Sequence, residues 1–136
     1  MIVGTEAVEA ALKIARQYFL ELPEKQPKRT RFIARRQSYH GNTLGSLSVG
    51  GHVGRKQMYN PILSTNTSHV SPCYPYRGQN DGESDEAYVS RLARELEDEF
   101  QAVGPETVCA FVAETVAGTV SIRLLRISLS GKPTIF

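Results

Sequence analysis

The chain has 136 residues, of which 40% are hydrophobic and 22% charged, and its formal net charge is +2. A chain of this length and composition is typical of one globular domain with a sizeable core, and its weak charge indicates neither nucleic acid nor an anionic membrane as a partner. No stretch approaches the ~20 apolar residues of a membrane span, and the first residues lack the apolar segment of a signal peptide. We therefore expect a cytoplasmic protein.

The first predicted element is a helix over residues 5–20. Thr5 is a suitable N-cap, and Glu6 and Glu9 suit the positive end of the helix dipole. The apolar stripe repeats at helical spacing in two sets, first Val8, Leu12, Ala15 and Phe19, then Ala7, Ala11, Ile14 and Tyr18.

In the middle of the chain, the sequence predicts short helices and strands. Residues 31–35 form a strand candidate, residues 43–49 a short helix containing a glycine, and residues 55–68 a loop. The prolines of residues 69–76 exclude a central strand beyond its first few residues. A basic cluster around the first strand is expected to be solvated rather than to bind nucleic acid, and comprises Lys28, Arg29, Arg31, Arg35 and Arg36.

A second strong helix is predicted over residues 85–103, with Ser84 as its N-cap. The continuous apolar run over residues 108–113 is typical of a strand that is buried on both faces. Because helices and strands alternate along the chain, the sequence predicts an α/β fold with a mostly parallel sheet flanked by helices.

Three places in this pattern could carry chemistry. At Gly4 and Thr5, a glycine and a hydroxyl open a helix, where backbone N–H groups favour a phosphate, although a simple cap gives the same pattern. Tyr39 and His40 follow a strand, where ligands of α/β sheets bind and an aromatic ring can stack on a planar cofactor, although a plain turn is also consistent. Glu114 ends the last apolar strand and is either a site residue or an ordinary solvated acid.

Other reactive side chains give weaker patterns. Cys73 and Cys109 are too few for a secreted disulfide framework, so we expect two thiols, the second of them a core residue. His52 and His69 lack partners at metal-ligand spacing, and we expect no metal site.

Three segments together resemble the class III aminotransferases, which are fold type I enzymes that use pyridoxal 5'-phosphate (PLP). The segments are GTEAVEAALKIAR from Gly4, RRQSYHGNTLG from Arg35, and the pair Ala113-Glu114. Their order and spacing fit the front part of the family's large domain. The resemblance predicts a partial PLP-dependent aminotransferase domain over residues 1–120.

The resemblance implies a role for each matching residue. Gly4 and Thr5 would bind the PLP phosphate, Tyr39 would stack on the pyridine ring, and His40 and Gly41 would shape the pocket. Glu114 would lie beside cofactor and substrate. The implied reaction moves an amino group between an amine or ω-amino acid and a keto acid, and the family further suggests a homo-oligomer, with neither nucleic acid nor a membrane as partner.

The chain also departs from the family pattern. Val3 precedes the glycine where the family has a serine, and Thr115 follows the glutamate where the family has a proline. The resemblance ends by Ser121, before the family's aspartate for the pyridine nitrogen and its Schiff-base lysine. Lys132 has no family context around it, so no catalytic residue is predicted.

We interpret residues 121–136 as a tail outside the family, and the chain as a truncated form that is inactive by itself. The hypothesis rests on the loss of resemblance after about residue 120, and genomic DNA without the missing segments in a nearby reading frame would exclude it. Two alternatives remain, namely a non-catalytic binding or interaction module derived from an aminotransferase, and a stand-alone α/β domain of unrelated function.

Overall fold

The computed structural model describes residues 4–115. The predicted tail over residues 121–136, with Lys132, lies outside the described residues, as does Val3. In chain order the elements are α1 (Gly4–Glu21), β1 (Arg31–Arg35), α2 (Leu44–Val49), α3 (Val53–Lys56), the 3-10 helix η1 (Asn60–Ile62), β2 (Thr67–Val70), α4 (Pro75–Gly78), α5 (Asp85–Val103), the 3-10 helix η2 (Pro105–Thr107) and β3 (Val108–Val112).

The three strands form one parallel sheet in the order β2-β1-β3. Ile33 of β1 lies opposite Ser68 of β2 and Phe111 of β3. The α/β prediction with a parallel sheet is therefore confirmed. Because the strands are parallel, their carboxyl ends lie at one edge of the sheet, where ligands of such folds bind.

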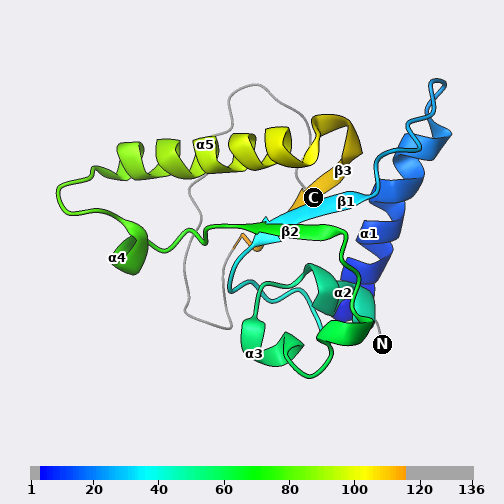
Figure 1. Ribbon diagram of the computed structural model, residues 1–136, viewed down its shortest axis with the longest axis horizontal. Coiled ribbons are helices and arrows are strands. Elements are labelled where there is room, and N and C mark those ends of the chain that lie inside the picture. Colours follow the sequence, from blue (N-terminus) through cyan, green and yellow to red (C-terminus); the bar gives the residue numbers. More distant parts are fainter. Residues whose placement is uncertain (1–3, 116–136) are drawn as a thin grey trace.

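Helices cover the sheet on both sides (Figure 1), with α5 on one side and α1, α2 and α3 on the other. The core lies between the sheet and α5, where Ile33, Val70 and Val108 are buried against Leu96 and Phe100. Leu96 and Phe100 lie four residues apart on α5, so they share the face of that helix that packs on the sheet.

The two long helices, α1 and α5, lie close to their predicted positions in the chain. Helix α5 has the predicted bounds, and the Ser84 hydroxyl caps it by accepting a hydrogen bond from the Ala87 N–H at 3.2 Å. Helix α1 begins one residue earlier than predicted, so Thr5 lies inside its first turn and is not its N-cap. The predicted second set of apolar residues on α1 is not core, because Ile14 and Tyr18 are 62% and 58% exposed.

Two predictions about strands and loops are wrong. Residues 55–68, predicted as a loop, contain η1 and the first residues of β2, which have too few residues for a periodic pattern to reveal. The expectation for residues 69–76 is confirmed, because β2 is an edge strand that ends at Val70, before the prolines. Strand β3 is not buried on both faces, since only Val108 of its five residues is fully buried. The central strand is β1, whose Ile33 and Ala34 have no exposed surface.

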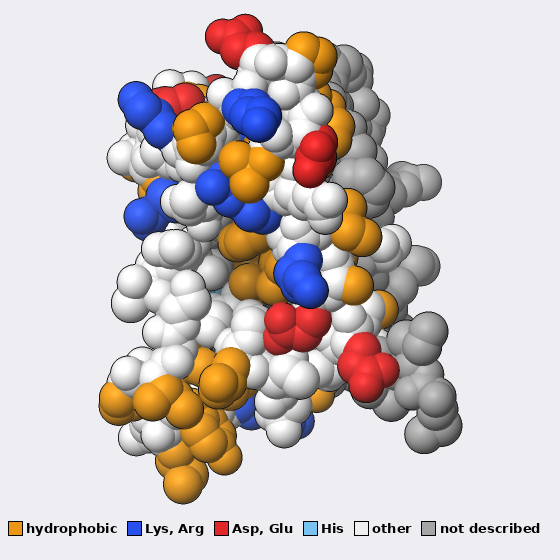
Figure 2. All heavy atoms as spheres, turned by 90° about the vertical axis from the view of Figure 1, so that its right-hand side faces the viewer, with side chains coloured by type: hydrophobic (Ala, Val, Ile, Leu, Met, Phe, Trp, Pro, Cys, Tyr) orange, Lys and Arg blue, Asp and Glu red, His pale blue; other side chains and the backbone are white. Residues whose placement is uncertain are grey.

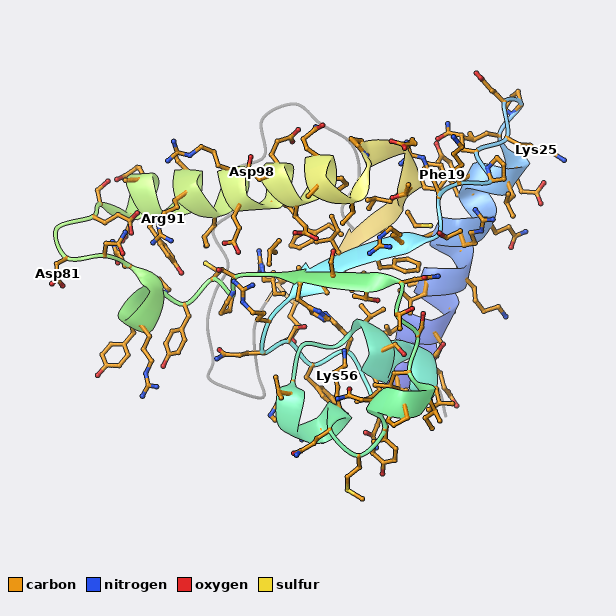
Figure 3. All side chains as sticks on the ribbon, in the orientation of Figure 1. Phe19, Lys25, Lys56, Asp81, Arg91 and Asp98 are labelled. Atoms are coloured by element: carbon orange, nitrogen blue, oxygen red, sulfur yellow. The ribbon has the colours of Figure 1, made fainter. Side chains whose placement is uncertain are left out.

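The basic cluster is only partly solvated, because Lys28 and Arg36 are exposed whereas Arg29, Arg31 and Arg35 are half-buried. The Arg29 guanidinium lies 4.4 Å from the centroid of the Phe19 ring, and its Nη1 donates to the carbonyls of Pro105 at 3.0 Å and Val108 at 2.6 Å. Figure 3 labels Phe19 on α1 beside this junction with the sheet. Arg35 is half-buried, and burial lowers its pKa. A guanidinium has five donors, so it can join several carbonyls where chain segments converge.

Candidate functional site

The first part of the candidate site is the contact between the start of α1 and the turn after β1. The Thr5 Oγ1 accepts a hydrogen bond from the Asn42 N–H at 3.3 Å. A hydroxyl has one donor and two acceptor positions, so the hydrogen bond from Asn42 does not use the Thr5 hydroxyl proton. A Cβ added to Gly4 would meet no atom within 4 Å, so there is open space at this side of the residue.

Gly41 of this turn lies closely packed against the side chains of Thr5 and Ser46. Its φ is +135°, and an added Cβ would lie 2.6 Å from the Thr5 Oγ1 and 2.5 Å from the Ser46 Oγ. Only glycine combines this backbone angle with so little space. Glycine is therefore required at position 41 by its backbone angle and by the side chains of Thr5 and Ser46.

The second part of the site joins the carboxyl ends of β1 and β3. The Glu114 carboxylate accepts a short hydrogen bond from the Tyr39 N–H. The two residues are 75 positions apart in sequence, and both follow strands that end at the same edge of the sheet. Glu114 is half-buried and holds the backbone that carries the Tyr39 ring, so the alternative of an ordinary solvated acid is wrong.

The Tyr39 ring has a cationic neighbour. The Arg55 guanidinium of α3 lies 4.8 Å from the ring centroid, within cation–π range. Arg55 itself is exposed to solvent. Sequence reasoning missed this contact because residues 55–68, which include Arg55, were predicted only as a loop.

His40 is buried between these two parts. It is 8% exposed, and its Nε2 has no hydrogen-bond partner among the residues the structure describes. Burial, together with the neighbouring His69 and Arg35, lowers the pKa of His40 to about 4. The imidazole is therefore neutral at pH 7.

The turn that contains Gly41 is followed by helix α2, which is fixed at both ends. At its start, the Glu9 carboxylate of α1 accepts hydrogen bonds from the Thr43 hydroxyl and, at 2.9 Å, from the Ser46 N–H. At its end, the Lys56 Nζ donates to the carbonyls of Ser48 at 2.8 Å and Gly50 at 3.0 Å (Figure 3). From its place in the sequence, Glu9 was expected only to suit the helix dipole of α1, because its contacts with Thr43 and Ser46 join residues far apart in the chain.

Cys109 and His69 have hydrogen-bond contacts of their own. The Cys109 Sγ donates to the Arg29 carbonyl at 2.9 Å, and burial raises the pKa of the thiol, which suits a core residue and not a nucleophile. The His69 Nε2 lies 3.0 Å from the Val49 carbonyl. Within residues 4–115, no three His, Cys, Asp or Glu side chains form a group suited to a metal ion. No helix in that part of the chain is long and apolar enough to cross a membrane.

The chain is similar in sequence to proteins of one family. Residues 1–124 match the family described as aminotransferase class-III. An aminotransferase of Gibberella zeae is 57% identical over 119 residues, and an uncharacterized aminotransferase of Schizosaccharomyces pombe is 59% identical over 115 residues. These matches cover 87% and 85% of this chain, but 23% and 25% of the relatives. The chain therefore spans about a quarter of their length.

Solved structures that are similar to this chain are also transaminases. An omega transaminase from Pseudomonas jessenii in complex with PMP is similar with a TM-score of 0.81 and 32% identity, over 91% of this chain and 27% of that one. A PLP-bound amine transaminase from an uncultivated Pseudomonas species is similar with a TM-score of 0.75 and 34% identity, over 84% of this chain and 25% of that one.

Proposed function

Because the chain belongs to the class III aminotransferase family, we propose that its residues form the phosphate and ring end of a PLP site in a transaminase. The observation that carries this proposal is the hydrogen bond from Asn42 to Thr5, which places the turn after β1 at the open start of α1. Helix starts of this kind bind phosphate through their N–H groups and dipole.

The residues present fit the cofactor. Gly4 has open space at one side, Thr5 has a hydroxyl proton to donate, and Gly41 lets the turn approach without a side chain. Tyr39 supplies an aromatic ring whose backbone Glu114 holds in place. PLP, when bound, supplies an electron sink for charge that develops on the substrate carbon.

The proposed reaction is amino transfer between an amine or ω-amino acid and a keto acid. Support comes from relatives whose names describe transaminases, including a mitochondrial gamma-aminobutyrate transaminase of Oryza sativa that is 36% identical over 119 residues. A cytoplasmic location and a homo-oligomer stay predictions, and other relatives are named as mitochondrial or chloroplastic.

Titration of the 136-residue chain with PLP tests the phosphate site. We expect Thr5→Val to weaken PLP binding by about tenfold or more, since hydrogen bonds to charged groups contribute roughly 1.5–3 kcal/mol, while Thr5→Ser keeps the hydroxyl and the affinity. Pyridoxal, which lacks the phosphate, should bind more weakly than PLP. Equal binding of pyridoxal and PLP, or an unaffected Thr5→Val variant, would contradict the proposal.

A non-catalytic interaction module is the second candidate, and exposed hydrophobic side chains favour it. Val53 and Met58 in the α3 region and Ile62 in η1 are 78%, 84% and 63% exposed. Figure 2 shows hydrophobic side chains gathered at the lower corner of one face, at the level of these elements in Figure 1. Size-exclusion chromatography with and without a full-length class III aminotransferase tests this candidate, and unchanged elution would refute it.

A further inference from the structure

We propose that Glu9 is a positioning residue for the phosphate turn, because its carboxylate attaches the start of α2 to α1. This inference rests on the proposed function for its link to PLP, but the geometry of the turn can be tested without any ligand. Glu9 lies on α1 one helical turn beyond Thr5, so the two side chains share a face of that helix.

The start of α2 lacks a cap of its own. Thr43 occupies the N-cap position, but its side chain makes no capping hydrogen bond to the helix. The Glu9 carboxylate takes over this role by accepting from the Ser46 N–H at 2.9 Å and from the Thr43 hydroxyl. A negative charge at a helix start is also favoured by the helix dipole.

Ser46 connects the Glu9 carboxylate to the turn, because it contacts both Glu9 and Gly41. It has no exposed surface, and its Oγ lies where a Cβ on Gly41 would come within 2.5 Å. The same hypothetical Cβ would lie 2.6 Å from the Thr5 Oγ1. Gly41 is therefore confined between Ser46, which Glu9 holds, and Thr5, which is proposed to bind phosphate. Movement of Ser46 would change the distance between the turn and Thr5.

Gly45 supports the same conclusion independently. A Cβ added there would lie 2.6 Å from the Glu9 Oε1 and 2.8 Å from its Cδ. The carboxylate therefore fills the space that a side chain at this position would take. Alanine normally favours a helix by up to about 1 kcal/mol over glycine, so any loosening caused by Gly45→Ala must come from displacement of Glu9.

Amide hydrogen exchange of the ligand-free 136-residue chain tests the attachment. We expect Glu9→Ala to accelerate exchange of the Ser46 and Asn42 amides by about tenfold or more, because the Ser46 donor loses its acceptor. Glu9→Gln keeps an acceptor oxygen and should restore most of the protection. Ser84→Ala is the matched control, since it removes one capping bond from α5, away from the turn.

A second variant and a second readout separate this inference from the proposed function. If Glu9→Ala does not fold, Gly45→Ala is expected to accelerate the same two amides. In PLP titrations, Glu9→Ala should raise the dissociation constant about tenfold, whereas Ser84→Ala should leave it unchanged. Exchange of Ser46 and Asn42 that is no faster than in Ser84→Ala overturns the role of Glu9. If Glu9→Ala accelerates exchange of both amides but the wild-type chain binds no PLP, the role of Glu9 is supported and the phosphate site is contradicted.

Discussion

Burial of a neutral His40 predicts that the folded chain loses stability in mild acid. The imidazole is 8% exposed, and its pKa falls from an ordinary value of 6.5 to about 4. Because the unfolded state takes up the proton more readily than the folded state, acid favours unfolding. The contribution of His40 is fully present above pH 6.5 and is lost as the pH falls toward 4.

The size of the effect follows from the two pKa values. The difference between 6.5 and about 4 corresponds to about 3 kcal/mol when protonation is complete, of which about 2 kcal/mol is lost between pH 7 and pH 5. Burial also lowers the pKa of His69, which acts in the same direction. Carboxylates with lowered pKa values, such as Glu83 at about 2, lose their contribution mainly below this window.

Urea unfolding at pH 7 and at pH 5 measures this loss. We expect the wild-type chain to lose about 2 kcal/mol or more of unfolding free energy between the two pH values, and His40→Gln to lose about 2 kcal/mol less than the wild type. An NMR titration of the His40 ring should give a pKa near 4. The reasoning fails if His40→Gln and the wild type lose the same free energy, or if the ring titrates near 6.5.

Three further predictions concern single contacts. Gly41→Ala should destabilise the chain more than Gly82→Ala in urea unfolding, since both have positive φ but only Gly41 has atoms against its added Cβ, and equal losses would contradict the crowding. Tyr88→Phe should cost about 1–2 kcal/mol in the same assay, because the buried hydroxyl accepts from the Tyr74 N–H at 2.8 Å; a loss below 0.5 kcal/mol, roughly the lower limit for one hydrogen bond, would refute this. Arg55→Met should change the chemical shifts of the Tyr39 ring with a stability loss of about 0.5–1 kcal/mol or less, and unchanged shifts would exclude the cation–π contact.

The candidate site residues were named from sequence because their residue types carry local information. A glycine and a hydroxyl at a helix start, an aromatic after a strand and an acid after another strand each have a meaning within a few residues. The structure brings Thr5 to the turn of Gly41 and Asn42, and Glu114 to Tyr39. Whether these residues bind PLP stays a prediction.

The sequence by itself determined the long elements and the class of fold. Helices α1 and α5 and strand β1 follow from periodicity, caps and apolar runs, which act over one or two turns of chain. Tertiary structure alone decided that Glu9 caps α2, that Arg29 joins α1 to the carbonyls around β3, and that His40 is buried and neutral. The physical reason is that these contacts join residues far apart in sequence or depend on burial, and packing of the whole sheet with its helices places them.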